Sequence, residues 1–298
     1  MTRSVFLLYG MAAALMAQTL PSFDVASVKE NKSSAAAPNS NFPLGPGDVY
    51  SSNGGHFTAT NLPLISYIFF AYKIMGDQAQ SVTSQLPGWV TTDRFDILAN
   101  TDGNAARDTK DQMRLMMRSL LAERFKMVTH YETRQVPILA AVPVKPGKAG
   151  PQLQPHPADA ECSTAVPTAS GPDPQAAVGP GYPTLCGGFL PMPPSAPGRV
   201  RVGARNVTMA FITMGLSAIG NLGRPVVDQT GLSGNFDMVV EWVPEANAPN
   251  SAGPDFQPDP SGPTFLEAVK EQLGLKLDSQ KGPSEFLVID HIDHPTAN

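Results

Sequence analysis

Residues 94–125 read RFDILANTDGNAARDTKDQMRLMMRSLLAERF, and this stretch predicts a short strand followed by a helix. Alternating apolar and polar side chains favour a strand at 94–99. Residues 109–112 (TKDQ) are typical of a helix-starting capping box. The helix behind them places apolar side chains at i, i+3, i+4, i+7 and i+8, which predicts one core-facing stripe. Its members are Met113, Met116, Met117, Leu120 and Leu121.

The same order of signals returns about 145 residues later, which indicates an internal repeat. Residues 236–242 (FDMVVEW) match the strand at 95, and residues 264–267 (TFLE) form a second capping box. Asn61 can cap the predicted helix that follows it, and Asn206 sits at the matching place in the second unit. Each unit is expected to read strand, helix, strand, strand, helix and a final strand pair, over 56–144 and 199–292. Chance similarity of two generic units is the alternative.

The fold class expected from these patterns is α+β, with two similar modules of mixed or antiparallel sheets and helices on one face. Whether the two modules share one sheet is left open. A short strand is expected at 81–85. The final strand pairs are expected at 125–133 with 135–144, and at 275–279 with 285–292.

The N-terminal residues 1–17 (MTRSVFLLYGMAAALMA) are typical of a signal peptide, with one Arg followed by a short apolar run. The run is shorter than the about 20 residues that a spanning helix needs. A buried N-terminal helix or an uncleaved anchor is the alternative. We therefore expect a secreted or periplasmic protein with no transmembrane segment after signal removal.

Prolines divide the rest of the chain. They concentrate at 143–197 and 244–263, which marks these stretches as loops. The predicted organisation is a first module at 18–145, a Pro/Gly-rich loop at 146–197 and a second module at 198–298. Cys162 and Cys186 both lie in that loop, and an even pair in an exported chain favours a disulfide. It would stabilise the fold by about 3 kcal/mol. A redox or metal-binding pair is the alternative.

Charge and motifs exclude several functions. The net charge is −5 and no dense Lys/Arg stripe occurs, which argues against nucleic acid as a partner. No Gly-x-Ser-x-Gly, His-Glu-x-x-His or phosphate-binding loop is present. No cofactor and no metal site are expected, so the chain is more simply read as a non-enzyme.

Four side chains are the candidate ligand-facing residues: Trp89, Asp96, Asp237 and His291. The two Asp residues belong to a Phe-Asp-apolar triplet, and paired carboxylates suit acid–base chemistry if their strands converge. Strand alternation explains the same pattern without any function. His291 lies in a His/Asp-rich run at 290–294, for which a solvated strand end is the simpler interpretation than a metal site. Trp89 could stack on a sugar ring or pack in the core.

Several blocks of sequence resemble one known family. They are FDVASVK at 23–29, PGW at 87–89, RFDI at 94–97, LLAERFK at 120–126, HYETR at 130–134, DQTGLSGNFD at 228–237 and QLGLKLDSQKGP at 272–283. Together they are similar to a secreted, highly paralogous family of unknown function that is abundant in soil Acidobacteria. In that family a related domain is attached to antibiotic-sensing-type sensor-transducer peptidases. The resemblance implies an exported domain and supplies no catalytic residues.

The leading functional hypothesis is therefore a non-enzymatic extracytoplasmic binding or interaction module. Its partner would be an envelope glycan or an envelope protein, and a groove between the repeats would be the site. A cell-envelope hydrolase that uses Asp and His residues is the first alternative, and a purely structural envelope protein is the second. The hydrolase requires Asp96, Asp237 and His291 to converge in one pocket.

Overall fold

The computed structural model describes residues 20–33, 37–48, 50, 52–101, 109–160, 162, 181–245 and 257–295. The predicted signal peptide at 1–17 lies outside these residues, as does 163–180 of the predicted loop. Within the described ranges, no helix combines the length and the apolar character needed to cross a membrane. Helices and mixed or antiparallel sheets make up the structure, so the predicted α+β class is confirmed.

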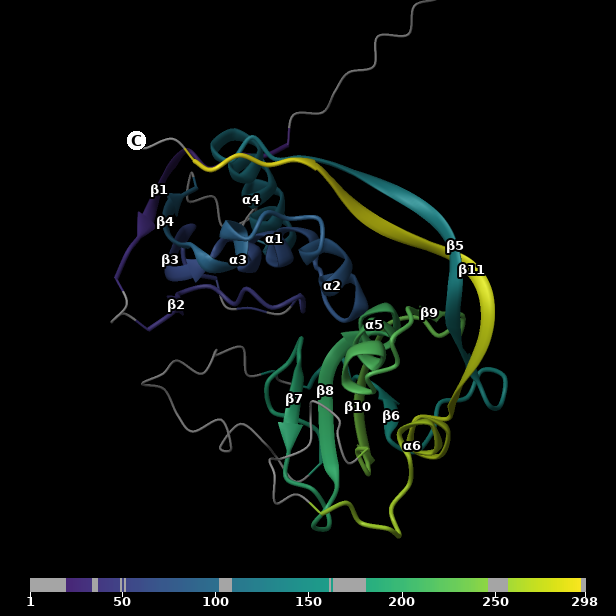
Figure 1. Cartoon of the computed structure of the whole chain (residues 1–298). Helices are drawn as coiled ribbons and strands as arrows, with labels where there is room; N and C mark the ends of the chain where they lie inside the picture. Colours follow the sequence, from purple (N-terminus) through teal and green to yellow (C-terminus); the bar gives the residue numbers. More distant parts are fainter. Residues whose placement is uncertain are drawn as a thin grey trace, which may run out of the picture.

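The first lobe is built on a four-stranded antiparallel sheet with the order β1-β4-β3-β2 (Figure 1). Its strands are β1 (Val25–Asn31), β2 (Asn39–Ser40), β3 (His56–Pro63) and β4 (Arg94–Asn100). Its helices are α1 (Leu64–Tyr72), α2 (Asp77–Thr83), α3 (Trp89–Thr92) and α4 (Lys110–Arg124). Helix α4 buries the predicted stripe of Met and Leu side chains against this lobe, because those residues share one helical face.

The second lobe repeats this sheet order as β6-β10-β8-β7. Its strands are β6 (Leu153–Pro155), β7 (Phe189–Met192), β8 (Val200–Thr208) and β10 (Asn235–Trp242). Its helices are α5 (Met209–Ile219) and α6 (Phe265–Gln272). In each sheet the strand that enters the lobe pairs with the fourth strand in sequence. This correspondence supports the predicted internal repeat, and the module boundaries at 145 and 198 stay predictions.

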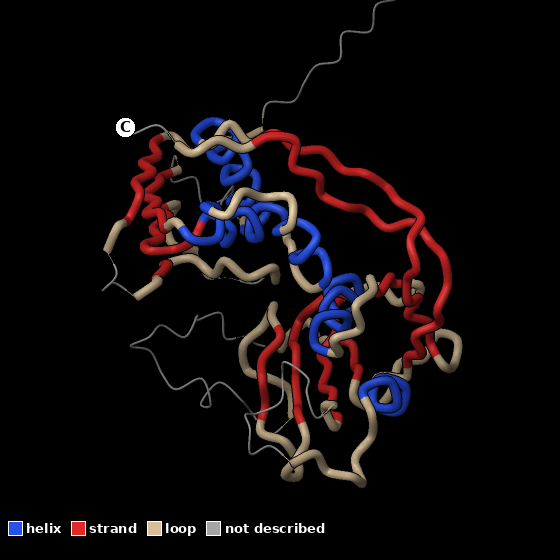
Figure 2. The backbone as a smooth tube through the Cα atoms, viewed as in Figure 1, coloured by secondary structure: helices blue, strands red, loops and turns tan. Residues whose placement is uncertain are grey.

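A long two-stranded ribbon joins the lobes (Figure 2). Strands β5 (Val128–Pro143) and β11 (Leu275–His291) pair antiparallel over their whole length, and β9 (Val226–Asp228) adds to β5 in parallel. The two predicted strand pairs are therefore wrong, since each is one continuous strand. Residues 280–284 were expected to connect the second pair, but they are paired within the ribbon, including Gly282 and Pro283. Proline is tolerated there because the ribbon has open edges.

The ribbon exchanges strands between the hydrophobic cores. Leu287 of β11 is buried in the first core, where Ile289 and Ile292 also pack. Leu139 and Ala141 of β5 are buried in the second core. Each lobe is therefore completed by the final strand of the other half of the chain.

Local signals start helices α4 and α6 as predicted, whereas the N-cap of α1 is Pro63 rather than Asn61. Thr264 and Glu267 form a reciprocal capping box at α6, and Thr109 accepts a hydrogen bond from the backbone of Gln112 at α4. The strand expected at 81–85 is wrong. Residues up to Thr83 belong to α2, where hydrogen bonds such as Ser84 N–H to the Gln80 carbonyl follow helical spacing.

Candidate functional site

Each sheet contains a β-bulge that is closed by an aspartate. In the first lobe the register shifts between Ala59 and Leu62, which leaves two residues, one more than the ladder needs, opposite Asp96. One of them, Asn61, has a left-handed backbone (φ 55°), a conformation that Asn tolerates better than most residues. Asp96 Oδ1 accepts the Asn61 backbone N–H at 2.8 Å and the Asn31 Nδ2 amide at 2.8 Å.

The second lobe has the same bulge at the corresponding place. The register shifts between Phe236 and Met238, opposite Asn206, which is also left-handed (φ 54°). Asp237 Oδ1 accepts the Asn206 backbone N–H at 2.9 Å. Asp96 and Asp237 are thus equivalent, and each holds an irregular strand in place through a hydrogen bond to its backbone.

The partners of Asp237 differ from those of Asp96. His156 donates from Nδ1 to Asp237 Oδ1 at 2.7 Å, and Arg205 Nε lies 3.9 Å from Oδ2. The side chains of His156 and Asp237 are only 7% and 6% exposed. A carboxylate only accepts hydrogen bonds, so Nδ1 carries a proton and Nε2 of a neutral imidazole keeps its lone pair. Nearby Tyr182 has its pKa raised, mainly by burial and further by the charge of Asp237.

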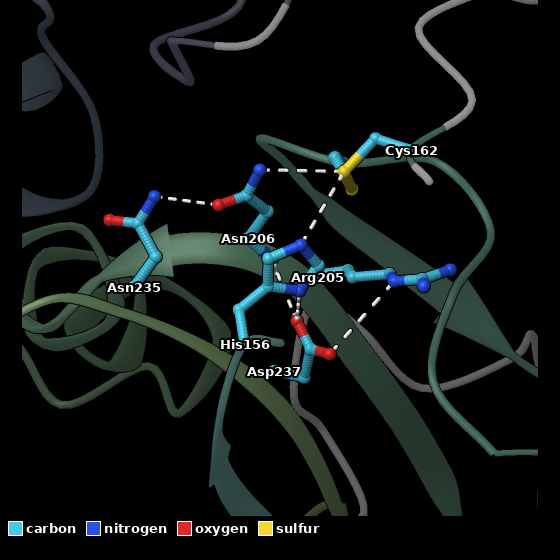
Figure 3. The surroundings of a disulfide bond; sticks show 7 residues. His156, Cys162, Arg205, Asn206, Asn235 and Asp237 are labelled. Atoms are coloured by element: carbon cyan, nitrogen blue, oxygen red, sulfur yellow. Dashed lines mark hydrogen bonds and ion pairs between the residues drawn. A yellow bond between two sulfur atoms is a disulfide. The ribbon is translucent and has the colours of Figure 1, made fainter. Parts of the chain in front are cut away.

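The predicted disulfide joins Cys162 to Cys186, with the Cα atoms 5.5 Å apart, so this prediction is confirmed. It covers the His156–Asp237 pair (Figure 3). Nε2 of His156 lies 3.9 Å from the Cys162 sulfur, and Asn206 Nδ2 donates to the same sulfur at 3.4 Å. We call His156, Cys162, Cys186, Asn206 and Asp237 the disulfide cluster.

The four predicted ligand-facing residues do not meet in one place. Asp96 and Asp237 lie in different sheets. His291 is exposed at the end of β11, where it pairs with Asp293 at 3.0 Å. Trp89 is half-buried and stacks on Phe125, with ring centroids 6.5 Å apart. Their contact with a ligand stays a prediction.

Sequence reasoning missed His156, Arg205 and Asn206 as members of one site. Asn206 carried a usable signal, because an Asn recurs at the junction of a strand and a helix in both lobes. His156 carried none, because it lies 81 residues from Asp237 and only the sheet pairing brings them together.

A groove with a volume of about 860 Å³ lies between the lobes. We call it the inter-lobe groove. Helix α2 of the first lobe lines one side, the end of α5 and the following turn line another, and both ribbon strands contribute. Its polar and aromatic lining side chains are Gln80, Ser81, Ser84, Ser217, Asn221, Arg224 and Phe286.

Helix α2 is fixed to the ribbon beside this groove. The Gln85 side chain donates to the Leu287 carbonyl at 3.2 Å and accepts the Ile289 N–H at 3.0 Å. The Gln85 amide thus pairs with the edge of β11 as a neighbouring strand would. A second pocket of about 380 Å³ shares Pro225 with the groove and includes Asp228 and Glu285.

The first lobe also holds a network of charged side chains around the buried Arg114. Arg114 is 2% exposed and bonds Asp48 and Asp111 at 2.7 Å each. Burial opposes ionisation of Asp48, but hydrogen bonds from Lys73 and Arg114 outweigh it and lower its pKa. Burial, together with the charge of Arg114, lowers the pKa of Lys110 to about 7. Since the carboxylates bond only cations of the protein here, we assign the network a structural role.

Comparison with known proteins places the chain in one family. No curated protein and no solved structure matches it. Residues 65–292 match the family described as protein of unknown function, DUF3738. This stretch covers strand β4 of the first sheet, the whole second sheet, the groove, the disulfide cluster and the ribbon. The chain belongs to the DUF3738 family.

Proposed function

We propose that the protein is an exported, non-enzymatic binding module that holds a hydroxyl-rich ligand, such as an envelope glycan, in the inter-lobe groove. The observation that carries this proposal is the groove itself. Its volume of about 860 Å³ is in the range of small-molecule and oligosaccharide sites. Two lobes and the ribbon contribute to it, so a bound ligand would contact all three parts.

The lining chemistry favours a polar ligand. Five of the lining side chains carry a hydroxyl or an amide, and these can both donate to and accept from sugar hydroxyls. Phe286 adds an aromatic ring, against which Arg134 packs at 5.1 Å. Arg224 is the one charged side chain among the described lining residues of the groove. A ligand with a carboxylate would therefore be preferred to a basic one.

Export is supported by three observations of different kinds. The N-terminal sequence is typical of a signal peptide, the two cysteines form a disulfide, and disulfides persist in oxidising compartments. The resemblance to an exported family of soil Acidobacteria, whose related domain is found on sensor-transducer peptidases, points the same way. We infer that the protein works outside the cytoplasm, as a domain that binds rather than transforms its ligand.

The hydrolase alternative loses its main support in this arrangement. Asp96 and Asp237 each accept a backbone N–H of their own sheet, so both are engaged in holding the bulges. His291 pairs with Asp293 at the far end of β11. A binding function needs none of these residues.

The test is a thermal-shift screen of the oxidised protein, followed by calorimetry, with neutral and acidic glycan fragments and envelope peptides. A ligand that binds only the folded state raises the melting temperature by mass action. We expect acidic glycan fragments to give the largest shift. Arg224→Ala should reduce affinity for them by about tenfold or more, because it removes a charge-assisted hydrogen bond.

A matched pair of variants on α2 locates the site. Ser81→Trp fills the groove, whereas Thr83→Trp lies two residues away on an exposed position that lines neither pocket. Ser81→Trp should abolish the ligand-induced shift, and Thr83→Trp should keep it. An unchanged response in Ser81→Trp would show that the ligand binds elsewhere. No response to any ligand class would favour a structural role.

A further inference from the structure

We propose that the disulfide cluster is a redox-gated metal site, in which reduction of Cys162–Cys186 creates a two-cysteine, one-histidine site for a thiophilic divalent cation such as Zn²⁺. The ligand atoms are the two sulfurs and Nε2 of His156. These three atoms all lie within 4.8 Å of one another. This site is separate from the inter-lobe groove and does not depend on the function proposed there.

The geometry is close to what zinc requires. Tetrahedral zinc holds Cys sulfur at about 2.3 Å and His nitrogen at about 2.0 Å, which places sulfur and nitrogen about 3.5 Å apart. Nε2 of His156 is already 3.9 Å from the Cys162 sulfur. The main movement needed is separation of the two sulfurs to about 3.8 Å once their bond is broken. Cys162 and Cys186 themselves lie outside the strands and helices.

The groups around the ligands match those that support metal sites. A His ligand commonly gives its other ring N–H to a carboxylate, which fixes the tautomer and the ring orientation. Here the Asp237 carboxylate holds Nδ1–H at 2.7 Å and directs Nε2 toward the sulfur. Asn206 donates an amide N–H to the Cys162 sulfur at 3.4 Å. Such a bond is stronger to a thiolate than to a neutral disulfide sulfur.

The corresponding bulge in the first lobe shows which features of the disulfide cluster a bulge does not require. There the bulge aspartate accepts from Asn31, and Asn31 occupies the position that His156 has in the second lobe. An Asn amide is enough to hold that aspartate. His156 performs the same task with a second nitrogen that faces two sulfurs, which the bulge does not require.

The chemistry has two steps. A thiol reductant supplies two electrons and two protons, becomes a disulfide itself and leaves Cys162 and Cys186 as two thiols. Zn²⁺ then binds two thiolates and the neutral imidazole, and the two thiol protons pass to solvent. The fourth tetrahedral position is open to water or to an added ligand. In the oxidised protein the sulfurs are bonded to each other and are not available.

The experiment uses the full mature chain, reduced with a phosphine so that no added thiol competes for metal. Zn²⁺ is titrated against a chromophoric chelator, and Co²⁺ is used as a spectroscopic probe. We expect one equivalent of metal, a thiolate-to-cobalt charge-transfer band and intense tetrahedral visible bands. The oxidised protein should give none of these signals.

His156→Asn is the decisive variant, because it copies the first lobe and keeps a donor for Asp237. It should fold normally and weaken metal binding by about tenfold or more. His130→Ala removes an exposed His that also pairs with a carboxylate, at 2.9 Å, and should change nothing. The Cys162→Ser/Cys186→Ser double variant sets the background.

Two results would overturn the proposal. One is metal binding by the reduced protein that does not exceed the double-variant background, whether the reduced protein is folded or not. The other is a His156→Asn protein with wild-type affinity and an unchanged cobalt spectrum. In either case the two cysteines would serve only as a structural disulfide.

Discussion

The two bulges share one construction and differ in what surrounds it. In both, an aspartate on the central strand accepts the backbone N–H of a left-handed Asn. In the first lobe the additional partner is the neutral amide of Asn31. In the second lobe it is His156, with Arg205 at 3.9 Å and a disulfide above.

The comparison separates the groups that hold the bulge in both lobes from the groups that the second lobe adds. Among the described residues, the first lobe closes its bulge without a histidine or a disulfide, so these two groups are not needed for the fold of such a sheet. Their presence in only one lobe marks the disulfide cluster as the region with chemistry to explain. Changes at matched positions can test this division.

The largest expected effect is on the two aspartates. Asp237→Ala leaves His156 and Arg205 without their carboxylate in a buried site, and we expect it to lower the free energy of unfolding by about 3–5 kcal/mol. Asp96→Ala removes only hydrogen bonds to neutral groups and should cost about 1–3 kcal/mol. Urea unfolding of both oxidised variants measures the difference. Equal losses, or a larger loss for Asp96→Ala, would contradict the comparison.

The disulfide comes next. Cys162→Ser/Cys186→Ser opens a loop with a sequence separation of 24 and should destabilise the protein by about 3 kcal/mol. The effect should be confined to the second lobe. Hydrogen exchange should become faster in β7 and β8 and stay unchanged in the equivalent β2 and β3. Faster exchange in both lobes alike would show that the disulfide stabilises the whole molecule.

The two left-handed asparagines should respond alike to the same substitutions if the two bulges are equivalent. An Ala side chain is strained at positive φ by about 1–2 kcal/mol, whereas Gly is not. We therefore expect Asn61→Ala to be less stable than Asn61→Gly by about this amount, and the same difference between Asn206→Ala and Asn206→Gly. Thermal unfolding of the four variants gives both differences. A difference present in one lobe only would argue that the bulges are not equivalent.

The last effect concerns pH and the charged network of the first lobe. The pKa of Lys110 is about 7 in the folded protein and about 10.4 when unfolded. Between these values the unfolded chain binds more protons, so this residue makes stability rise with pH, by at most about 1.4 kcal/mol per unit. The gain is lost as the pH falls toward 7.

Lys110→Met should remove that slope. The free energy of unfolding is measured for the wild type and the variant at pH 7.5, 8.5 and 9.5. The wild-type value minus the variant value should increase with pH. Arg134→Met, at an exposed cation, provides the control and should show no such trend. A flat difference for Lys110→Met would mean that the buried amine is charged throughout this range.

Local patterns predicted the parts of the fold that depend on nearby residues. The capping box at Thr264, the apolar stripe of α4 and the α+β class are confirmed, because each follows from side chains within one or two turns or strands. The disulfide is confirmed because the chain has only two cysteines.

Features that depend on distant pairing could not be predicted in the same way. A change of pattern near Gln135 and Gly282 looked like two turns, yet β5 and β11 continue because each supplies the other with hydrogen-bond partners. Likewise, nothing local to His156 shows that it will face Asp237. The sequence contains these residues, but the pairing of the strands determines which of them are in contact.

The exchange of strands in the ribbon constrains the order in which the two lobes can fold. His130 and Asp290, which bond across the ribbon, are 160 residues apart. During synthesis the core of the first lobe therefore cannot close until Leu287 has been made. Contacts so far apart in sequence fold slowly, since a long loop must be closed first. Strand β11 contributes side chains to both hydrophobic cores, so a chain truncated before it would leave both cores incomplete.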